Sequence, residues 1–218
     1  MGQPPVYYPV CLNVEGKRCL VVGGGEVAAR KVKALLEARA DVVVVSREMG
    51  RELSGCHGVT IVPRRWRARD LKGAFLVVAA TDDRSLNATI ARAARKNGVL
   101  CNVVDDASLS DFIMPATVRR GLLLIAVSTS GALPALARSI RERLEAVFGH
   151  EYGDYLEIVS EMRHTIIDAV PDETERGEIF DRLADPRFLA SVQSAGNEDI
   201  RKEIERIVRD TARKHPRG

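Results

Sequence analysis

Two patterns of hydrophobic and polar positions divide the chain near residue 127. Before it, short runs rich in β-branched residues alternate with stretches whose apolar side chains recur every three or four positions. Most of the runs are apolar throughout, as expected for parallel strands covered on both faces. They are residues 19–22, 42–45, 59–62, 75–80, 99–104 and 122–127. This alternation predicts an α/β fold with a doubly wound parallel sheet of the Rossmann type.

Helical periodicity fills the intervals between these runs. Residues 27–39 place Ala28, Val32 and Leu35 on one face of a helix. Asp82 or Asp83 can cap a second helix that Gly98 closes. After residue 127 the pattern predicts helices only, with Pro134 in the first turn of the first one. They cover residues 135–148, 152–170, 172–183 and 197–213.

Composition excludes several functional classes. The longest apolar run, residues 74–80, is far shorter than the roughly 20 residues that span a bilayer. The first residues also lack the pattern of a signal peptide. Aromatic residues make up only 5% of the 218 and the net charge is +3, which argues against a nucleic-acid partner. We therefore expect a cytoplasmic protein without a membrane or nucleic-acid partner.

Charge is distributed unevenly along the chain. Residues 1–112 carry 17 basic and 12 acidic side chains, and residues 113–150 carry five and two. Residues 151–218 carry 11 basic and 16 acidic side chains. The basic surplus coincides with the candidate chemistry described below, although a solvated surface explains it equally well.

Cysteine and histidine spacing does not predict a metal site. The four cysteines include no C-x-x-C pair, and the four histidines are dispersed. Cys19 and Cys101 lie inside strand-like runs, where a free thiol behaves as a small apolar side chain. Cys56-His57 is the single Cys–His neighbour pair and lacks further ligands at a useful spacing.

The sharpest motif follows the first predicted strand and begins the first predicted helix. It reads Gly-Gly-Gly-Glu-Val-Ala from position 23 and fits the dinucleotide fingerprint G-x-G-x-x-A. Gly23 permits the tight turn, Gly25 lets a pyrophosphate approach the backbone, and Ala28 allows close helix–strand packing. The alternative is a glycine turn without a ligand. Free N–H groups at the helix start favour an anion, so we assign to cofactor binding Gly23, Gly24, Gly25, Glu26 and Val27.

One part of the fingerprint is missing. An acidic residue about 20 positions later should hold the ribose hydroxyls, but the second strand ends in Ser46-Arg47, with Glu48 beyond. Arg47 favours a 2′-phosphate and hence NADP, whereas Ser46 and Glu48 favour NAD; the sequence leaves this open. Thr81, at the end of the fourth predicted strand, is a further candidate cofactor contact. The neighbouring Asp82 and Asp83 are candidate helix caps.

Several segments together resemble one known family over residues 7–145. Their order and combination are more specific than any single motif. The segments are Tyr8-Pro9-Val10, Leu12-Asn13-Val14, Gly16-Lys17, residues 23–28 with Arg30-Lys31, residues 79–83 with Asn87, residues 102–105, residues 112–116, and residues 126–131 with Pro134 and Ala137-Arg138. This combination resembles the siroheme-synthase family, in its precorrin-2 dehydrogenase and sirohydrochlorin ferrochelatase module.

The resemblance implies a reaction and an architecture. Family members oxidise precorrin-2 to sirohydrochlorin and pass a hydride to NAD, and some also insert ferrous iron. The implied organisation is an NAD-binding Rossmann domain over residues 1–112, a dimerisation region over residues 113–150 and a helical C-terminal domain over residues 151–218. It also implies a homodimer whose substrate lies in a cleft between domains. At 218 residues the chain cannot hold the methyltransferase domain of larger members, so precorrin-2 would come from a separate enzyme.

Asp105 matches the aspartate that the family is thought to use in catalysis. It follows the predicted strand 99–104, at the sheet edge where ligands bind in such folds. A carboxylate there can take a proton as hydride leaves the macrocycle, or help to remove pyrrole protons during metal insertion. The alternative is an aspartate that caps a turn, and Asp106 and Asp111 lie close enough to confuse the assignment.

Hydroxyl and arginine side chains suit the carboxylates of a tetrapyrrole. Residues 128–131 join the last predicted strand to the helix at Pro134, where hydroxyls and free N–H groups suit an anion. The alternatives are a helix cap, solvated arginines and, for residues 112–114, core packing. The candidate substrate contacts are Asn102, Phe112, Met114, Arg119, Arg120, Ser128, Thr129, Ser130 and Arg138.

Two other functions stay open at this point. One is a bifunctional enzyme that also inserts iron, because chelatases need only a transient metal site. The other is a regulatory module that senses NAD(H) without catalysis. The second alternative explains the glycine motif but gives no role to residues 102–105 or 112–115.

Overall fold

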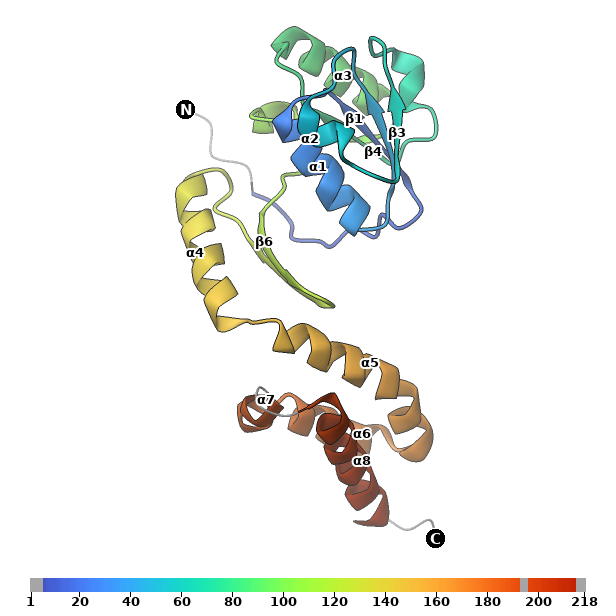
Figure 1. The fold of residues 1–218 in the computed structure, drawn as a ribbon, viewed down its shortest axis with the longest axis vertical. Coiled ribbons are helices and arrows are strands. Elements are labelled where there is room, and N and C mark those ends of the chain that lie inside the picture. Colours follow the sequence, from blue (N-terminus) through green and yellow to red (C-terminus); the bar gives the residue numbers. More distant parts are fainter. Residues whose placement is uncertain (1–5, 193–195, 215–218) are drawn as a thin grey trace. The chain divides into compact units, whose positions relative to one another are not determined.

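The computed structural model describes residues 6–192 and 196–214, and it divides the chain into two compact units between Met114 and Pro115. Each unit is described by itself (Figure 1). The first unit contains a five-stranded parallel sheet in the order β3-β2-β1-β4-β5. Its strands are β1 (Arg18–Val22), β2 (Asp41–Val45), β3 (Val59–Val62), β4 (Leu76–Ala79) and β5 (Leu100–Val103). The predicted α/β fold with a parallel sheet is confirmed.

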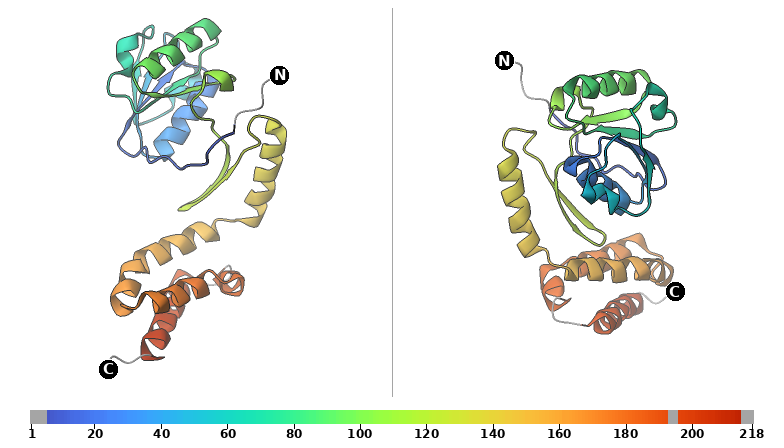
Figure 2. Two further views of the ribbon diagram at one scale, coloured as in Figure 1. Left: turned by 180° about the vertical axis from the view of Figure 1, so that it is seen from behind. Right: turned by 45° about the horizontal axis from the view of Figure 1, so that its top comes forward.

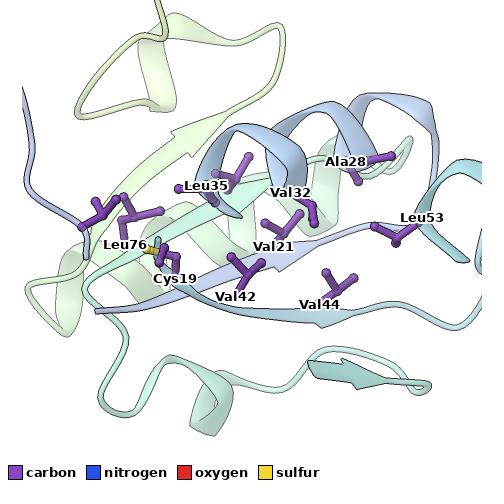
Figure 3. Packing of buried hydrophobic residues seen from close by; sticks show 13 residues of the cluster. Cys19, Val21, Ala28, Val32, Leu35, Val42, Val44, Leu53 and Leu76 are labelled. Atoms are coloured by element: carbon purple, nitrogen blue, oxygen red, sulfur yellow. The ribbon is translucent and has the colours of Figure 1, made fainter. Parts of the chain in front are cut away.

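Helices cover both faces of this sheet, as Figure 2 shows from two further directions. Helix α1 (Glu26–Glu37) buries Val32 and Leu35 against one face, and α3 (Arg84–Lys96) buries Ile90 against the other. Successive strand residues alternate between the two faces, so Val21 packs on the α1 side and Leu20 on the α3 side. Figure 3 shows the α1 side of this core. The apolar runs of the sequence are continuous because both of their faces are buried.

The two cysteines in the strands belong to this core. Cys19 and Cys101 are fully or almost fully buried. Burial raises the pKa of each thiol to about 11, and the nearby carboxylates of Asp41 and Asp111 act in the same direction. Both thiols therefore stay protonated near neutral pH, and their predicted role as small apolar side chains is confirmed.

The second unit begins with an antiparallel hairpin instead of another parallel strand. Strands β6 (Ala116–Arg120) and β7 (Leu123–Val127) pair across a two-residue turn in which Gly121 has a φ of +50°. The prediction that residues 122–127 continue the parallel series is wrong. A parallel strand needs a long crossover connection, whereas the chain between β5 and β6 contains no helix longer than the 3₁₀ turn η2 (Ala107–Leu109).

Helices make up the rest of the second unit, as predicted. They are α4 (Pro134–Val147), α5 (Glu151–Ala169), α6 (Glu173–Leu183), α7 (Pro186–Val192) and α8 (Asn197–Lys214). Helix α7 and the short elements α2 (Arg51–Ser54) and η1 (Ala68–Leu71) were not predicted, since each is too short to show a period. Helices α5, α6 and α8 share an apolar cluster centred on Ile166, Ile179 and Ile204. There, the hydroxyl of Tyr155 donates a 2.9 Å hydrogen bond to the carbonyl oxygen of Leu183.

A buried ion pair holds the connection between β3 and β4. Arg64 donates from Nη1 to Oδ2 of Asp70 at 2.8 Å and from Nη2 to Oδ1 at 2.7 Å. The backbone N–H of Arg67 donates to Oδ2 at 2.9 Å. Asp70 is only 6% exposed. The hydrogen bond from Arg64, followed by the one from the Arg67 backbone, lowers the pKa of the Asp70 carboxyl below its ordinary value.

We expect Asp70→Asn to destabilise the first unit by about 1–3 kcal/mol at pH 7, because it leaves buried donors without their charged acceptor. The folded-state pKa lies below the unfolded value of about 3.9. The carboxylate therefore stabilises the fold above that pH and loses its effect as pH falls through the folded pKa. Urea unfolding of both proteins, from pH 7 down to about pH 3, should show the difference shrinking in acid.

The control for this prediction is Asp82→Asn, which alters an exposed aspartate in the same unit. Surface changes of this kind usually shift stability by less than about 0.5 kcal/mol. An equal loss for both variants, or an Asp70→Asn loss that acid does not reduce, would contradict the assignment.

Candidate functional site

The glycine turn between β1 and α1 lies at the point where the strand order reverses. Strand β1 has β2 on one side and β4 on the other, and ligands of open parallel sheets bind at such a switch point. Burial changes steadily along the turn, with Gly23 buried, Gly24 half-buried and Gly25 exposed. The three glycines therefore meet three different surroundings.

Gly23 and Gly24 are required by close backbone contacts. A Cβ at Gly23 would overlap the carbonyl oxygen of Ala80, and the φ of Gly23 is +130°. A Cβ at Gly24 would overlap the carbonyl oxygen of Glu48. These contacts bring the turn against the chain that follows β4 and the chain that follows β2.

Gly25 has a different environment, because a Cβ there would meet nothing within 4 Å. Gly25 is the N-cap of α1, and no side chain accepts a hydrogen bond from the first turn of this helix. The free N–H groups and the helix dipole favour an anionic group there. Glu26 is exposed and Val27 is half-buried in the same turn. These residues fit the pyrophosphate of a dinucleotide, because no protein atom lies within 4 Å of the position that a Cβ of Gly25 would take.

The end of β2 carries Ser46 and Arg47. The backbone N–H of Ser46 donates to the carbonyl oxygen of Val62 at 3.3 Å, and its Oγ donates to the carbonyl oxygen of Glu48 at 2.6 Å. Arg47 is exposed. The structure therefore brings both predicted ribose contacts to the same edge as the glycine turn.

Thr81 follows β4 and is held by Asn87. Its Oγ1 donates to Oδ1 of Asn87 at 2.7 Å, and Nδ2 of Asn87 donates back to the carbonyl oxygen of Thr81 at 2.9 Å. Of the two aspartates proposed as helix caps, Asp83 accepts from the backbone N–H of Leu86 at 3.0 Å. Asn87 is 5% exposed, so it positions Thr81 from within the fold.

Asp105 and the two nearby aspartates that could be confused with it have different surroundings. Asp106 accepts hydrogen bonds from the backbone N–H of Ser108 at 3.0 Å and from its Oγ at 2.6 Å. Asp111 accepts from the backbone N–H of Cys101 at 2.9 Å. Asp105 is exposed, its φ is +63°, and within the described part of the chain its carboxylate accepts no hydrogen bond. Asp105 is thus the one of the three whose carboxylate stays available to a ligand.

Asn102 and Phe112 meet where the chain folds back along the free edge of β5. Nδ2 of Asn102 donates to the carbonyl oxygen of Phe112 at 2.9 Å, and Asn102 is 7% exposed. The side chains of Phe112 and Met114 pack against the apolar cluster on the α1 side of the sheet. These contacts give all three predicted substrate contacts a structural role within the first unit.

Lys31 is a residue of this region to which sequence reasoning gave no role. Burial lowers the pKa of its ammonium group, and the charge of Arg30 lowers it further. The carboxylate of Asp105 acts in the opposite direction, so the two side chains lie within electrostatic reach. Helical spacing could have indicated Lys31, because it is three residues after Ala28 and four before Leu35, on the buried face of α1.

The remaining predicted substrate contacts lie in the second unit, at different places along the hairpin and helix α4. Ser128, Thr129 and Ser130 lie at the open end of the hairpin, where Oγ of Ser128 accepts from the N–H of Ser130 at 3.0 Å. Oγ1 of Thr129 accepts from the N–H of Leu133 at 3.2 Å. Ser130 has a positive φ of +52°. The hydroxyl oxygens are thus used as acceptors at the start of α4, and their hydrogens stay available as donors.

The two arginines of the hairpin have different environments. Arg120 donates from Nε to the carbonyl oxygen of Phe148 at 3.0 Å and from Nη2 to that of Glu145 at 3.4 Å. It therefore satisfies carbonyl groups at the end of α4, which gives this predicted substrate contact a structural role within the second unit. Arg119 is exposed at the turn end of the hairpin, away from Ser128. Arg138 is exposed near the start of α4.

The described residues contain neither a metal-binding cluster nor a membrane-spanning helix. No group of three or more His, Cys, Asp or Glu side chains among them is placed to hold a metal ion. Within the same residues no helix combines the length and apolar character needed to cross a membrane.

The carboxyl edge of the first sheet thus combines a backbone anion site with a free carboxylate. The ends of β1 and β5 are separated by one strand, or about 10 Å at the usual strand spacing. This arrangement suits a dinucleotide that crosses the switch point with its pyrophosphate at Gly25. The fold and the site together define a dinucleotide-binding protein of the Rossmann type.

Comparisons with known proteins support this class and show which proteins the chain resembles. A family model described as putative NAD(P)-binding matches residues 10–116. Siroheme synthases from Neisseria meningitidis serogroup C and Methylococcus capsulatus are each 36% identical, over 91% and 94% of this chain. The siroheme synthase of Chromobacterium violaceum is 37% identical over 93% of this chain. A solved structure named SirC, precorrin-2 dehydrogenase, matches with a TM-score of 0.73 and 27% identity, covering 92% of this chain and 100% of that one.

The chain is similar to siroheme synthases over more than nine tenths of its own length. It spans 42% to 44% of the length of the three siroheme synthases named above. The predicted family resemblance is therefore confirmed for a module that makes up less than half of those proteins.

We expect Gly25→Ala to weaken dinucleotide binding at least tenfold without destabilising the fold. The φ of Gly25 is −82°, and a Cβ there meets no protein atom within 4 Å. Alanine at such a position stabilises by about 0.4–1 kcal/mol through the unfolded state, but its methyl group stands where the pyrophosphate would approach. Isothermal titration calorimetry with NAD⁺ and a thermal unfolding curve measure the two effects.

Gly177→Ala is the matched control, because a Cβ at Gly177 in α6 would also meet nothing within 4 Å. It should leave the dissociation constant for NAD⁺ unchanged. If Gly25→Ala binds NAD⁺ as tightly as the control, the turn does not receive the pyrophosphate.

Proposed function

We propose that this protein oxidises precorrin-2 to sirohydrochlorin with a nicotinamide dinucleotide as the hydride acceptor, NAD⁺ in the first instance. The observation that carries the proposal is the free carboxylate of Asp105, which lies at the same sheet edge as the glycine turn. The likeness to siroheme synthases and to SirC, precorrin-2 dehydrogenase, supports the choice of substrate.

The chain's own residues would hold the cofactor along the edge of the sheet. The N–H groups of the first turn of α1 bind the pyrophosphate at Gly25, and the residues that follow β2 bind the adenosine ribose. The other half of the dinucleotide then extends past Thr81 toward the end of β5. When bound there, the nicotinamide ring supplies the hydride acceptor.

Asp105 would take the proton that accompanies hydride loss. Precorrin-2 loses two hydrogens in this oxidation, one as a hydride to the dinucleotide and one as a proton. The proton passes to the carboxylate of Asp105, which releases it to solvent, because the side chain is exposed. Lys31 lies within electrostatic reach of Asp105 and places a positive charge near this carboxylate.

Charged and hydroxyl groups of the second unit would bind the substrate carboxylates. Arg119 and Arg138 are exposed cations, and Ser128, Thr129 and Ser130 keep hydroxyl hydrogens available at the start of α4. The protein would act as a homodimer, as the resemblance implies. Insertion of ferrous iron is a separate hypothesis, which anaerobic incubation of sirohydrochlorin with Fe²⁺ in the absence of NAD⁺ tests.

We expect Asp105→Asn to lower kcat at least about 100-fold, the lower end of what a positioned acid or base contributes. Asparagine tolerates the left-handed backbone as aspartate does, so folding and NAD⁺ affinity should be unchanged. The measurement is NADH formation from precorrin-2 under anaerobic conditions, together with calorimetric binding of NAD⁺.

Asp41→Asn is the control, because Asp41 is an exposed aspartate at the opposite end of the strands. It should retain full turnover. Near-normal turnover of Asp105→Asn would remove Asp105 from the mechanism. An absence of NADH formation by the unaltered protein, with NAD⁺ bound, would favour the regulatory alternative instead.

A further inference from the structure

The adenosine end of the site has no acidic side chain at the end of β2. In this position an aspartate or glutamate hydrogen-bonds the ribose hydroxyls and repels a 2′-phosphate, whereas a nearby arginine accommodates that phosphate. Here β2 ends at Val45 and continues as Ser46-Arg47. The hydroxyl of Ser46 is committed to the carbonyl oxygen of Glu48 at 2.6 Å.

Backbone contacts fix Arg47 beside the glycine turn. On one side, the N–H of Ser46 donates to the carbonyl oxygen of Val62 at 3.3 Å. On the other, the carbonyl oxygen of Glu48 lies where a Cβ of Gly24 would be, and the N–H of Gly50 donates to the carbonyl oxygen of Gly24 at 2.9 Å. Arg47 therefore stands between two residues that are anchored to the pyrophosphate site and to the end of β3.

The guanidinium group of Arg47 is available to a ligand. Arg47 is exposed, and within the described ranges it forms no hydrogen bond or ion pair with a side chain. Arg65, just beyond the end of the neighbouring strand β3, is also exposed. By contrast, Arg64 is held by Asp70 in a bidentate pair. The edge thus presents two free cations where the adenosine ribose would lie.

We propose that this edge binds the 2′-phosphate of NADP⁺, so that the protein accepts NADP⁺ as well as NAD⁺, with Arg47 as the residue that determines this specificity. The inference rests on the proposed function for the place of the dinucleotide. Arginine suits the role because its planar fork can donate two hydrogen bonds to one phosphate. Arg65, three residues after the end of the adjacent strand β3, adds a second exposed positive charge at this edge.

The test compares equilibrium binding of NAD⁺ and NADP⁺ by calorimetry, for the unaltered protein and for Arg47→Leu. In the unaltered protein we expect the two dissociation constants to agree within about threefold. Arg47→Leu should raise the dissociation constant for NADP⁺ at least about tenfold more than that for NAD⁺. The loss of a hydrogen bond to a charged group has an effect of this size. Rising NaCl should weaken NADP⁺ binding more steeply than NAD⁺ binding, because salt screens the exposed pair.

Arg95→Leu is the matched control, because it removes an exposed arginine from the last turn of α3, at the opposite end of the sheet. It should leave the ratio of the two constants unchanged. The probes 2′,5′-ADP and 5′-AMP, bound to the unaltered protein, give the same comparison without any variant. The proposal is overturned if NADP⁺ binds at least tenfold more weakly than NAD⁺, or 2′,5′-ADP at least tenfold more weakly than 5′-AMP. It is also overturned if Arg47→Leu raises the dissociation constants of both dinucleotides equally.

Failure of the proposed function would look different. A protein that binds both dinucleotides but does not oxidise precorrin-2 retains the specificity proposed here and loses the proposed reaction. A protein that binds NAD⁺ tightly, oxidises precorrin-2 and rejects NADP⁺ retains the reaction and loses this inference. A protein that binds neither dinucleotide overturns both.

Discussion

The backbone of Gly23 lies so close to the carbonyl oxygen of Ala80 that no side chain fits between them, and the carboxyl edge of the sheet depends on this approach. Two backbone hydrogen bonds next to this turn join the ends of β1, β2 and β4. The N–H of Gly23 donates to the carbonyl oxygen of Val45 at 3.1 Å, and that of Ala80 donates to the carbonyl oxygen of Val22 at 2.8 Å. Because these contacts are made by backbone atoms, the relative positions of the ribose, pyrophosphate and Thr81 regions do not depend on side-chain rotamers. A single Cβ at Gly23 or Gly24 would displace all three together.

Local patterns were sufficient to predict the parallel sheet of the first unit and its two long helices, because each of these features is encoded within a few residues. Continuous apolar runs marked the strands, and the glycine motif marked the turn into α1. The hairpin of the second unit was not predicted, because its strand pairing is not encoded in a local apolar run. Val118 is its one fully buried strand residue, and alternate residues such as Thr117 and Leu124 are exposed. Its pairing partner is decided by the two-residue turn at Gly121 and by the lack of a crossover helix, not by the apolar run of residues 122–127.

The candidate site was predictable by residue type but not by residue. Asp105, Asp106 and Asp111 lie in one polar segment, and the sequence selects Asp105 only through the family resemblance. They differ because the segment folds back on β5, where Asp111 satisfies the N–H of Cys101 and Asp106 caps η2. Arg119 and Arg120 differ in the same way, since successive strand residues face opposite sides and only Arg120 reaches the end of α4. The contacts of Asp111 and Arg120 join positions 10 and 28 residues apart, beyond any local pattern.

The backbone at Asp105 bears on its role more directly than its charge does. The N–H of Asp106 donates to the carbonyl oxygen of Val103 at 3.2 Å, which closes a four-residue turn with Asp105 in the third position. A positive φ at that position usually requires glycine or asparagine, and an L-residue there costs about 1–2 kcal/mol. Glycine would make the same turn at lower cost. Since the carboxylate of Asp105 supports no hydrogen bond in the described fold, its presence does nothing for the turn that glycine would not do better. This backbone cost supports the proposal that the side chain serves a ligand at the edge of the sheet.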